Sequence, residues 1–333
     1  MIPGSYTFHG LKLRVDAPDG CGEILGSFHA RLAALPADGG GPAEGHADIH
    51  LEIQAGPKHL LRRPEGARTV YDPPVGEVVY DDAGDRLYLE HGPRLRALCE
   101  PAAGRATFSV LEPLAPEAED RWVLSHPLLS VPLLELCKRR GLFGVHAAGA
   151  SLDGRALVLA GTSGSGKSTL SLALARNGFD FLGDDTLFLS RVSPGPDLRV
   201  LAFPDEVDLT EQTVSFFPEI APWLAPRPAG WRKRQLRAEE AFGARIAWEC
   251  EPAVLVFPRV SGRPVSELRP IDSGEALFEL APNVLLTEPR SSQAHLDALA
   301  ELARRSRCYR LETGGGRDGL DEAVRLLREL MER

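Results

Sequence analysis

The stretch Gly161-Thr162-Ser163-Gly164-Ser165-Gly166-Lys167-Ser168 decides the fold class of this chain, because it matches the pattern G-x-x-x-x-G-K-[ST]. An apolar run at residues 156–160 precedes it, and a helical pattern at residues 167–177 follows it. A buried strand, a glycine loop and a helix in this order bind phosphate. The glycines let backbone N–H groups point inward, and the helix N-terminus adds positive potential. The stretch therefore predicts an α/β domain that binds a nucleotide.

The residues of this loop have distinct expected tasks. The Lys167 ammonium would neutralise β- and γ-phosphate oxygens, and the Ser168 hydroxyl would ligate Mg²⁺. The alternative is a chance match in a glycine-rich segment, which the low lysine content of the chain makes rare. We therefore expect ATP and Mg²⁺ as cofactors, with nucleotide contacts along the whole loop, namely Gly161, Thr162, Ser163, Gly164, Ser165, Gly166, Lys167, Ser168 and Thr169.

Two adjacent carboxylates follow the next apolar run, in the stretch FLGDDT at residues 181–186. In a parallel sheet the end of this strand lies beside the phosphate loop, so Asp184 and Asp185 would face the metal and the γ-phosphate. One acid can then hold Mg²⁺ while the other accepts a proton from an attacking hydroxyl group. The alternative interpretation is a solvated acidic turn.

His146 precedes the loop by about the length of one β-hairpin, within a predicted strand at residues 145–152. Its small neighbours, in the stretch HAAG at 146–149, leave room for a close approach. The imidazole could therefore contact an aspartate or a phosphate and tune the base. A core histidine without a chemical role is the alternative.

The order of the predicted elements divides the chain into two domains. Residues 1–120 carry short alternating runs that predict strands, at 6–15, 47–53, 77–80, 86–90 and 106–111, with one helix near 22–35. A proline-rich, acidic stretch at 113–120 marks the expected boundary. Residues 121–333 alternate helices and strands, beginning with an amphipathic helix at 127–140 that ends in the cations Lys138, Arg139 and Arg140. We predict a β-rich domain at 1–120 that recognises substrate and an α/β domain at 121–333, so that the chain is α+β overall.

Together these motifs resemble the kinase domain of HPr kinase/phosphorylase and of related kinases, which include kinases of lasso peptide precursors. The match runs through HAAG at 146–149, GTSGSGKST at 161–169 and GDD at 183–185, preceded by RRGLF at 139–143. It covers about residues 127–189. The resemblance implies a P-loop kinase domain of the HPr-kinase type and transfer of a γ-phosphate to a hydroxyl group, usually that of serine. It also implies that Asp184 is the base, His146 its hydrogen-bonded partner, and Asp185 a metal ligand or nearby acid.

The sequence departs from that family in two places. Thr169 stands where the family commonly has Glu, and no Pro-Gly-Arg-Asn stretch, which is linked to the reverse phosphorylase reaction, is found. The resemblance therefore does not extend to HPr as substrate, to phosphorolysis or to a hexamer. A second resemblance, of GTSGSGKSTLS and LGDD, is to the phosphate site of ATP-dependent phosphoenolpyruvate carboxykinase, and we interpret it as shared ancestry of that site.

The leading hypothesis is an ATP-dependent kinase that acts on a hydroxyl group of a peptide, protein or small molecule. A nucleotide-sensing module that transfers no phosphate is the second hypothesis, although such a module needs no acid pair. A P-loop ATPase that drives motion is the third, and a separate, more distant acidic strand would favour it. We find no convincing strand of that kind in the sequence.

A basic cluster follows the proline-rich region, in the stretch WRKR at residues 231–234 with Arg227 and Arg237 close by. Such a cluster can grip a phosphate or an anionic substrate, whereas the alternative is a solvated basic surface. We expect Lys233 and Arg234 to contact substrate or phosphate, and we add Arg259 as a further candidate.

Composition excludes several classes of protein. The chain has 333 residues, of which 43% are hydrophobic and 26% are charged, with a net charge of -9. These values exclude collagen, coiled-coil rods and wholly disordered chains, and the acidic balance argues against nucleic acid as a partner. Five scattered cysteines argue against a disulfide framework or a zinc site. Without a signal pattern or a long apolar run, we expect a cytoplasmic protein that does not bind membranes, and a homo-oligomer stays open.

Overall fold

The computed structural model describes residues 4–19, 21–37, 47–71, 77–111, 122–191, 197–226 and 233–333, which form a mixed α/β structure. Their contacts divide into two compact units. Unit 1 holds the described residues up to Arg140 together with Leu286–Ser292, and unit 2 holds the described residues of 141–285 and Gln293–Arg333. The predicted boundary at 120/121 lies outside the described residues. The packing divides instead at Arg140, so the helix expected to open the second domain belongs to unit 1.

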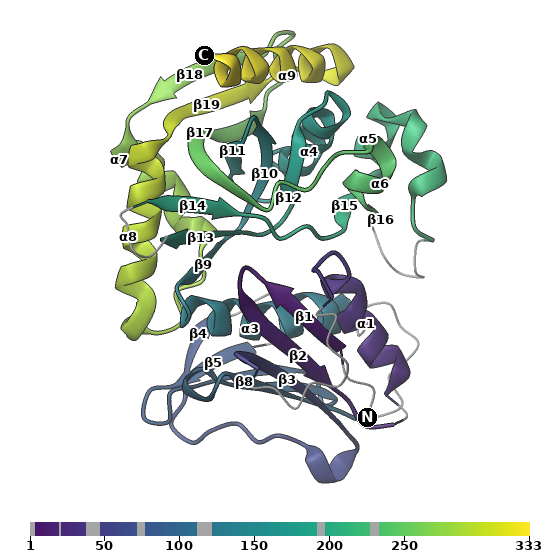
Figure 1. Ribbon diagram of the computed structural model, residues 1–333, viewed down its shortest axis with the longest axis vertical. Coiled ribbons are helices and arrows are strands. Elements are labelled where there is room, and N and C mark those ends of the chain that lie inside the picture. The colour runs from purple at the N-terminus through teal and green to yellow at the C-terminus, as the bar shows by residue number, and fades with distance from the viewer. Residues whose placement is uncertain are drawn as a thin grey trace. The chain divides into compact units, whose positions relative to one another are not determined.

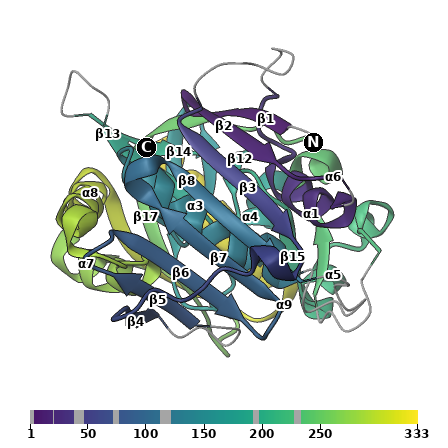
Figure 2. The same ribbon diagram turned by 90° about the horizontal axis from the view of Figure 1, so that it is seen from below.

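Unit 1 is built on one eight-stranded sheet in the order β1-β2-β3-β8-β7-β6-β5-β4 (Figure 2). In β3 every second residue is buried, which is the pattern of a strand with one covered face. Helices α1 and α3 pack on that covered face, since Phe28 contacts Phe108 edge to face and the Cys99 thiol approaches the Pro132 carbonyl. The strands are Gly4–Phe8, Leu11–Asp16, Ile49–Ala55, Arg68–Tyr71, Glu77–Asp81, Arg86–His91, Leu95–Glu100 and Arg105–Val110 (β1 to β8). The helices are Gly22–Leu32 (α1) and Leu129–Lys138 (α3), the latter preceded by a short π-helix at Leu124–Leu128.

The five strand runs predicted for this part of the chain all contain strands. The first, at 6–15, folds as the β1–β2 hairpin, because His9 and Gly10 adopt φ values of 47° and 84° at the turn between the two strands. The alternation of β7 was not among the predicted runs.

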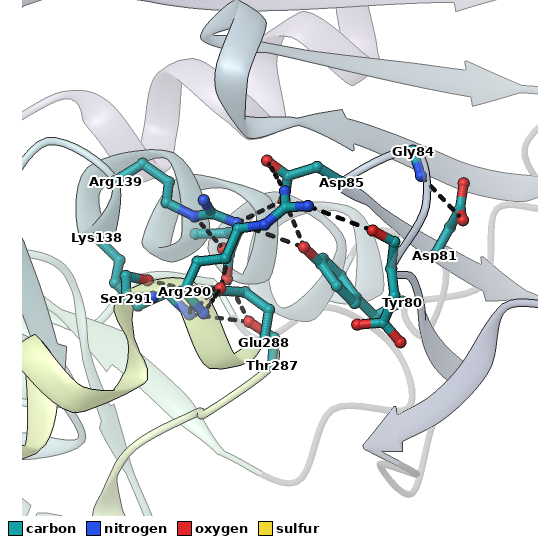
Figure 3. Close-up of polar contacts among 12 residues, drawn as sticks. Tyr80, Asp81, Gly84, Asp85, Lys138, Arg139, Thr287, Glu288, Arg290 and Ser291 are labelled. Atoms are coloured by element: carbon teal, nitrogen blue, oxygen red, sulfur yellow. Dashed lines mark hydrogen bonds and ion pairs between the residues drawn. The ribbon is translucent and has the colours of Figure 1, made fainter.

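A charge-balanced polar network joins Leu286–Ser292 to the rest of unit 1 (Figure 3). At its centre Lys138 Nζ lies 2.8 Å from Glu135 Oε2 and 3.4 Å from Glu288 Oε1, and all three side chains are at most 3% exposed. Nζ also donates a hydrogen bond of 2.9 Å to the Thr287 hydroxyl. Further out, Asp85 accepts from two arginines, each at 2.6 Å. The network pairs Asp85, Glu135 and Glu288 with Lys138, Arg139 and Arg290.

Unit 2 is built on a nine-stranded sheet in the order β12-β10-β11-β17-β14-β13-β9, with β19 paired to β17 and β18 to β19 (Figure 1). Alternate residues of β11 enter two separate hydrophobic clusters. Leu157 and Leu159 pack with α4 and α9, whereas Val158 and Ala160 pack with α7 and α8. Both faces of the sheet are therefore covered by helices, which accounts for the continuous apolar run of this strand.

The elements of unit 2 have the following bounds. The sheet strands are Leu142–Val145 (β9), Ala147–Leu152 (β10), Arg155–Ala160 (β11), Asp180–Gly183 (β12), Leu187–Arg191 (β13), Leu198–Leu201 (β14), Glu249–Val260 (β17), Glu267–Ile271 (β18) and Arg307–Thr313 (β19), while Val207–Leu209 (β15) and Arg234–Leu236 (β16) pair with each other. The helices are Lys167–Arg176 (α4), Glu211–Phe216 (α5), Ala238–Phe242 (α6), Ser273–Leu280 (α7), Pro289–Arg305 (α8) and Gly316–Glu332 (α9).

The sheet of unit 2 is mixed, whereas the placement of Asp184 and Asp185 was argued from the geometry of a parallel sheet. The mixed sheet still brings the expected strand ends together. Strand β10 is antiparallel to both β11 and β12, so these two strands run in the same direction. Strand β17 is parallel to β11, and β19 is parallel to β17. Four strands therefore end at one edge of the sheet, the edge at which β10 begins. The predicted strand at 145–152 is broken at His146, which places this residue at the same edge.

Candidate functional site

The glycine loop lies between the end of β11 and the start of α4. Gly164 and Gly166 have φ values of 81° and 96°, a region that favours glycine, and a Cβ on Gly166 would lie 3.3 Å from Val260 Cγ2. Lys167 Nζ donates to the loop carbonyls of Gly161 at 2.6 Å and Thr162 at 3.3 Å. The Lys167 side chain therefore lies against the same loop that is expected to bind the phosphate groups.

Asp184 follows β12 and is buried against the first turn of α4, with 4% of its surface exposed. The Ser171 hydroxyl donates a hydrogen bond of 2.7 Å to Asp184 Oδ1, and the Ser168 hydroxyl donates to the same carboxyl group. Burial raises the pKa of Asp184 to about 6, although the two serine hydrogen bonds act in the opposite direction. Asp184 therefore lies beside the residue expected to bind Mg²⁺.

Asp185 faces the other way and meets His146. His146 Nδ1 lies 2.9 Å from the Asp185 carbonyl oxygen and 3.2 Å from Asp185 Oδ1. Both side chains are open to solvent, with exposures of 44% and 54%, while the His146 backbone N–H donates to the Asn283 carbonyl at 2.7 Å. The histidine thus contacts Asp185, whereas the family resemblance implied Asp184.

Gly183 allows the two aspartates to occupy this turn. A Cβ at this position would lie 2.7 Å from the Phe203 carbonyl oxygen and 2.9 Å from that of Thr186. Both are backbone atoms, which cannot swing aside as the end of a side chain can. The glycine that precedes the acid pair is therefore required by close packing of the backbone.

A cavity of about 480 Å³ joins these groups at the sheet edge. Its volume falls in the range of small-molecule sites. Burial lowers the pKa of Lys167, and the positive charge of Lys233 lowers it further. The negative charges of Asp185 and Asp184 act in the opposite direction and raise it. The lining includes most of the loop (Ser163 to Thr169), the trio His146, Asp184 and Asp185, and, from other segments, Asp208, Thr210, Gln212, Thr213, Phe216, Lys233, Val260, Thr313, Gly314, Gly315, Gly316 and Leu320.

The three basic residues proposed from the sequence lie in different places. Lys233 lines the cavity, with Nζ 3.7 Å from Asp208 Oδ2. Arg234 pairs with Glu211 at 3.2 Å and Arg259 with Glu279 at 3.4 Å, and neither arginine is among the lining residues. Of the other basic residues of that cluster, Arg237 pairs with Glu239 at 3.2 Å, whereas Arg227 and Arg232 lie with Trp231 outside the described residues.

The segment from β15 to α5 contributes a wall of the cavity that the sequence did not indicate. The Thr169 hydroxyl lies 3.0 Å from the Thr213 hydroxyl, and Thr210 caps α5 by accepting from the Thr213 backbone N–H at 3.1 Å. The capping pattern at Thr210 was a detectable signal for a helix start. It carries no information about which surface the helix contacts.

The residues present fit a magnesium–nucleotide complex. Among the described residues, the buried Ser165 hydroxyl oxygen has no hydrogen-bond partner, although the residue lies in the loop that lines the cavity. Ser168, Asp184 and Asp185 offer oxygen ligands, which Mg²⁺ prefers, and Mg²⁺ needs few protein ligands because it keeps waters and phosphate oxygens. In the part of the chain that the structure describes, no group of three or more His, Cys, Asp or Glu side chains forms a self-sufficient metal cage.

Similarity to known proteins is found in structure and not in sequence. No family model matches the sequence, and no curated protein matches it. Among solved structures, the chain is similar to the HPr(Ser) kinase/phosphatase from Coxiella burnetii, at 16% identity and a TM-score of 0.29, over 57% of this chain and 99% of that one. A likeness of this size carries no argument about activity. None of the helices in the described segments is both long and apolar enough to cross a bilayer.

Proposed function

We propose that this chain is a Mg²⁺-dependent kinase that transfers the γ-phosphate of ATP to a hydroxyl group, that of a serine in a peptide or protein being the first candidate. One observation carries the proposal. A phosphate-binding loop, a buried carboxylate against its serine and an exposed histidine–carboxylate pair meet at one edge of one sheet. Binding alone needs the first of these, whereas phosphoryl transfer also needs an acid that holds the metal and a group that positions or deprotonates the acceptor, which the other two can supply.

The two aspartates are suited to different tasks. Asp184 is buried and accepts from Ser168, so it fits the acid that positions the metal beside the loop. Asp185 is more than half exposed and is held by His146, so an acceptor hydroxyl from solvent can reach it. These contacts favour exchanging the roles that the family resemblance implied, with Asp185 as base and Asp184 as the metal-positioning acid.

The proposed reaction moves the γ-phosphoryl group of ATP directly onto the acceptor hydroxyl. The Asp185 carboxylate takes the proton of the acceptor hydroxyl, and the hydroxyl oxygen attacks the γ-phosphorus. The bond between that phosphorus and the β–γ bridging oxygen breaks, and ADP leaves. His146 orients the Asp185 carboxylate, while Lys167 and Lys233 neutralise charge on the transferred group. Mg²⁺, when bound, supplies further neutralisation of the phosphate oxygens.

Paired variants test these roles. Asp185→Asn should bind Mg-ATP as the unaltered protein does, while transfer falls by about 10²-fold or more, since a general base contributes on that order. Asp184→Asn should instead weaken the dependence of nucleotide binding on Mg²⁺. Calorimetry with and without Mg²⁺, together with transfer of labelled γ-phosphate, separates the two effects. Full transfer by Asp185→Asn would contradict its assignment as the base.

A nucleotide-sensing module is the competing candidate. It would bind Mg-ATP with the same loop, but the unaltered protein would then transfer no phosphate, and Asp185→Asn would not differ from it in transfer. The exposed pair of His146 and Asp185 at the cavity favours the kinase, because a sensor has no use for a base there.

A further inference from the structure

The cavity has two chemically different ends. One end holds His146, Asp184 and Asp185, the groups suited to phosphoryl transfer. The other end is reached through Thr169, whose hydroxyl contacts Thr213 on α5 at 3.0 Å. Figure 1 draws β15, β16, α5 and α6 as a group beside α4, so this second end is formed where that group meets the helix after the phosphate loop.

The phosphate chain of a bound nucleotide sets which end receives the nucleoside. Its terminal phosphate must reach Asp185, since the acceptor is activated there under the proposed function. The remainder of the molecule must then extend away from the acidic end. Ser168 contacts Asp184 and the next residue along α4, Thr169, contacts α5, so the loop leads from the acidic end to the α5 wall.

The α5 wall presents a surface suited to a nucleobase. Gln212, Thr213 and Phe216 all line the cavity, and their spacing along α5 places them on one face of the helix. Phe216 is partly buried, and Leu320 of α9 adds another apolar side chain to the lining. An aromatic ring and an aliphatic side chain in a cavity that also holds charged and hydroxyl groups match a flat heteroaromatic ring.

We propose that Phe216 forms the nucleobase subsite, with its ring stacked on the base of the bound nucleoside triphosphate. The Gln212 amide, on the same helix face, offers a donor and an acceptor to the edge of the base. This inference rests on the proposed function for the direction of the phosphate chain. It adds a ligand contact that the phosphate loop itself does not supply.

The test compares a ligand that has a base with one that lacks it. Mg-ATP and Mg-tripolyphosphate are titrated into the unaltered protein, Phe216→Ala and Phe242→Ala by calorimetry. Phe242 is a matched control, because it is also a partly buried aromatic side chain packed on the same core cluster, yet it is not among the lining residues. Stacking lost on alanine substitution should weaken ATP binding to Phe216→Ala by about tenfold or more.

Phe216→Ala should leave the affinity for tripolyphosphate within about twofold, since the phosphate loop is untouched. Phe242→Ala should change the affinity for neither ATP nor tripolyphosphate. Unchanged ATP affinity in Phe216→Ala, or equal losses for both ligands, would overturn the subsite. Equal affinities of the unaltered protein for ATP and tripolyphosphate would also overturn it while leaving the phosphate site intact. If neither ATP nor tripolyphosphate binds the unaltered protein, both the nucleobase subsite and the proposed function are overturned.

Discussion

Replacing the buried aspartate of the site should make the protein more stable while it removes part of its function. Asp184 is 4% exposed, and its burial raises the pKa from 3.8 to about 6. That difference corresponds to about 3 kcal/mol of unfavourable free energy when the carboxyl is ionised in the nucleotide-free protein. Asn at this position cannot ionise, so Asp184→Asn removes this cost.

The net effect is smaller, because the amide keeps only part of the hydrogen bonding. Losing one of the two serine hydrogen bonds costs about 1 kcal/mol, which leaves a gain of about 2 kcal/mol for the variant at pH 7.5. For a domain of this size that gain corresponds to a rise in Tm of about 4 to 8 °C. The rise should be measured by thermal unfolding without nucleotide.

The sign of the pH dependence gives a sharper test. Because the folded carboxyl binds its proton more tightly than the unfolded one, the stability of the unaltered protein falls as pH rises from about 4 to about 6. The advantage of Asp184→Asn should therefore be large at pH 7.5 and small at pH 4.5. Asp185→Asn is the control, since that side chain is 54% exposed and should shift the Tm little. A variant Asp184→Asn that is less stable than the unaltered protein at pH 7.5 would refute the reasoning.

Other predictions concern the packing of each unit. Lys138→Ala should destabilise unit 1 by about 3 kcal/mol in urea unfolding, because it removes one of the two cations that pair with the buried carboxylates of Glu135 and Glu288, while Arg139 stays beside both. The exposed Lys58→Ala is the control, and equal stability of the two variants would contradict the role of the network. Gly183→Ala should cost about 1 to 3 kcal/mol and displace the acid pair, since its Cβ meets two backbone oxygens. Gly262→Ala, where a Cβ meets nothing within 4 Å, is its control, and full transfer by Gly183→Ala would count against the proposed constraint.

Contiguous signals in the sequence predicted the core of the site. The strand, the glycine loop and helix α4 follow one another along the chain, so local patterns suffice to place Lys167 and Ser168. The sequence also predicted that Asp184 lies beside the loop, although that prediction assumed a parallel sheet. In the structure the intervening strand β10 is antiparallel to both neighbours, and two reversals restore the common direction of β11 and β12.

Features that depend on distant contacts could not be predicted. Asp184 and Asp185 are adjacent, yet one is buried against α4 and the other meets His146, a division that depends on contacts with segments distant in the sequence. Phe216 lines the cavity from α5, a helix that packs beside β15, and β15 pairs with β16 from a later part of the chain. Lys138 has the sequence pattern of a solvated cation at a helix end, but Leu286–Ser292 covers it with Thr287 and Glu288.

Phosphate transfer itself tests the central claim most directly. The unaltered protein and Asp185→Asn are incubated with γ-labelled Mg-ATP and a size-fractionated extract of the source cells. Label should enter an acceptor only with the unaltered protein, and the size of the labelled fraction would tell whether the acceptor is a protein, a peptide or a small molecule. Tight binding of Mg-ATP without label in any fraction would contradict the kinase and favour the nucleotide-sensing module.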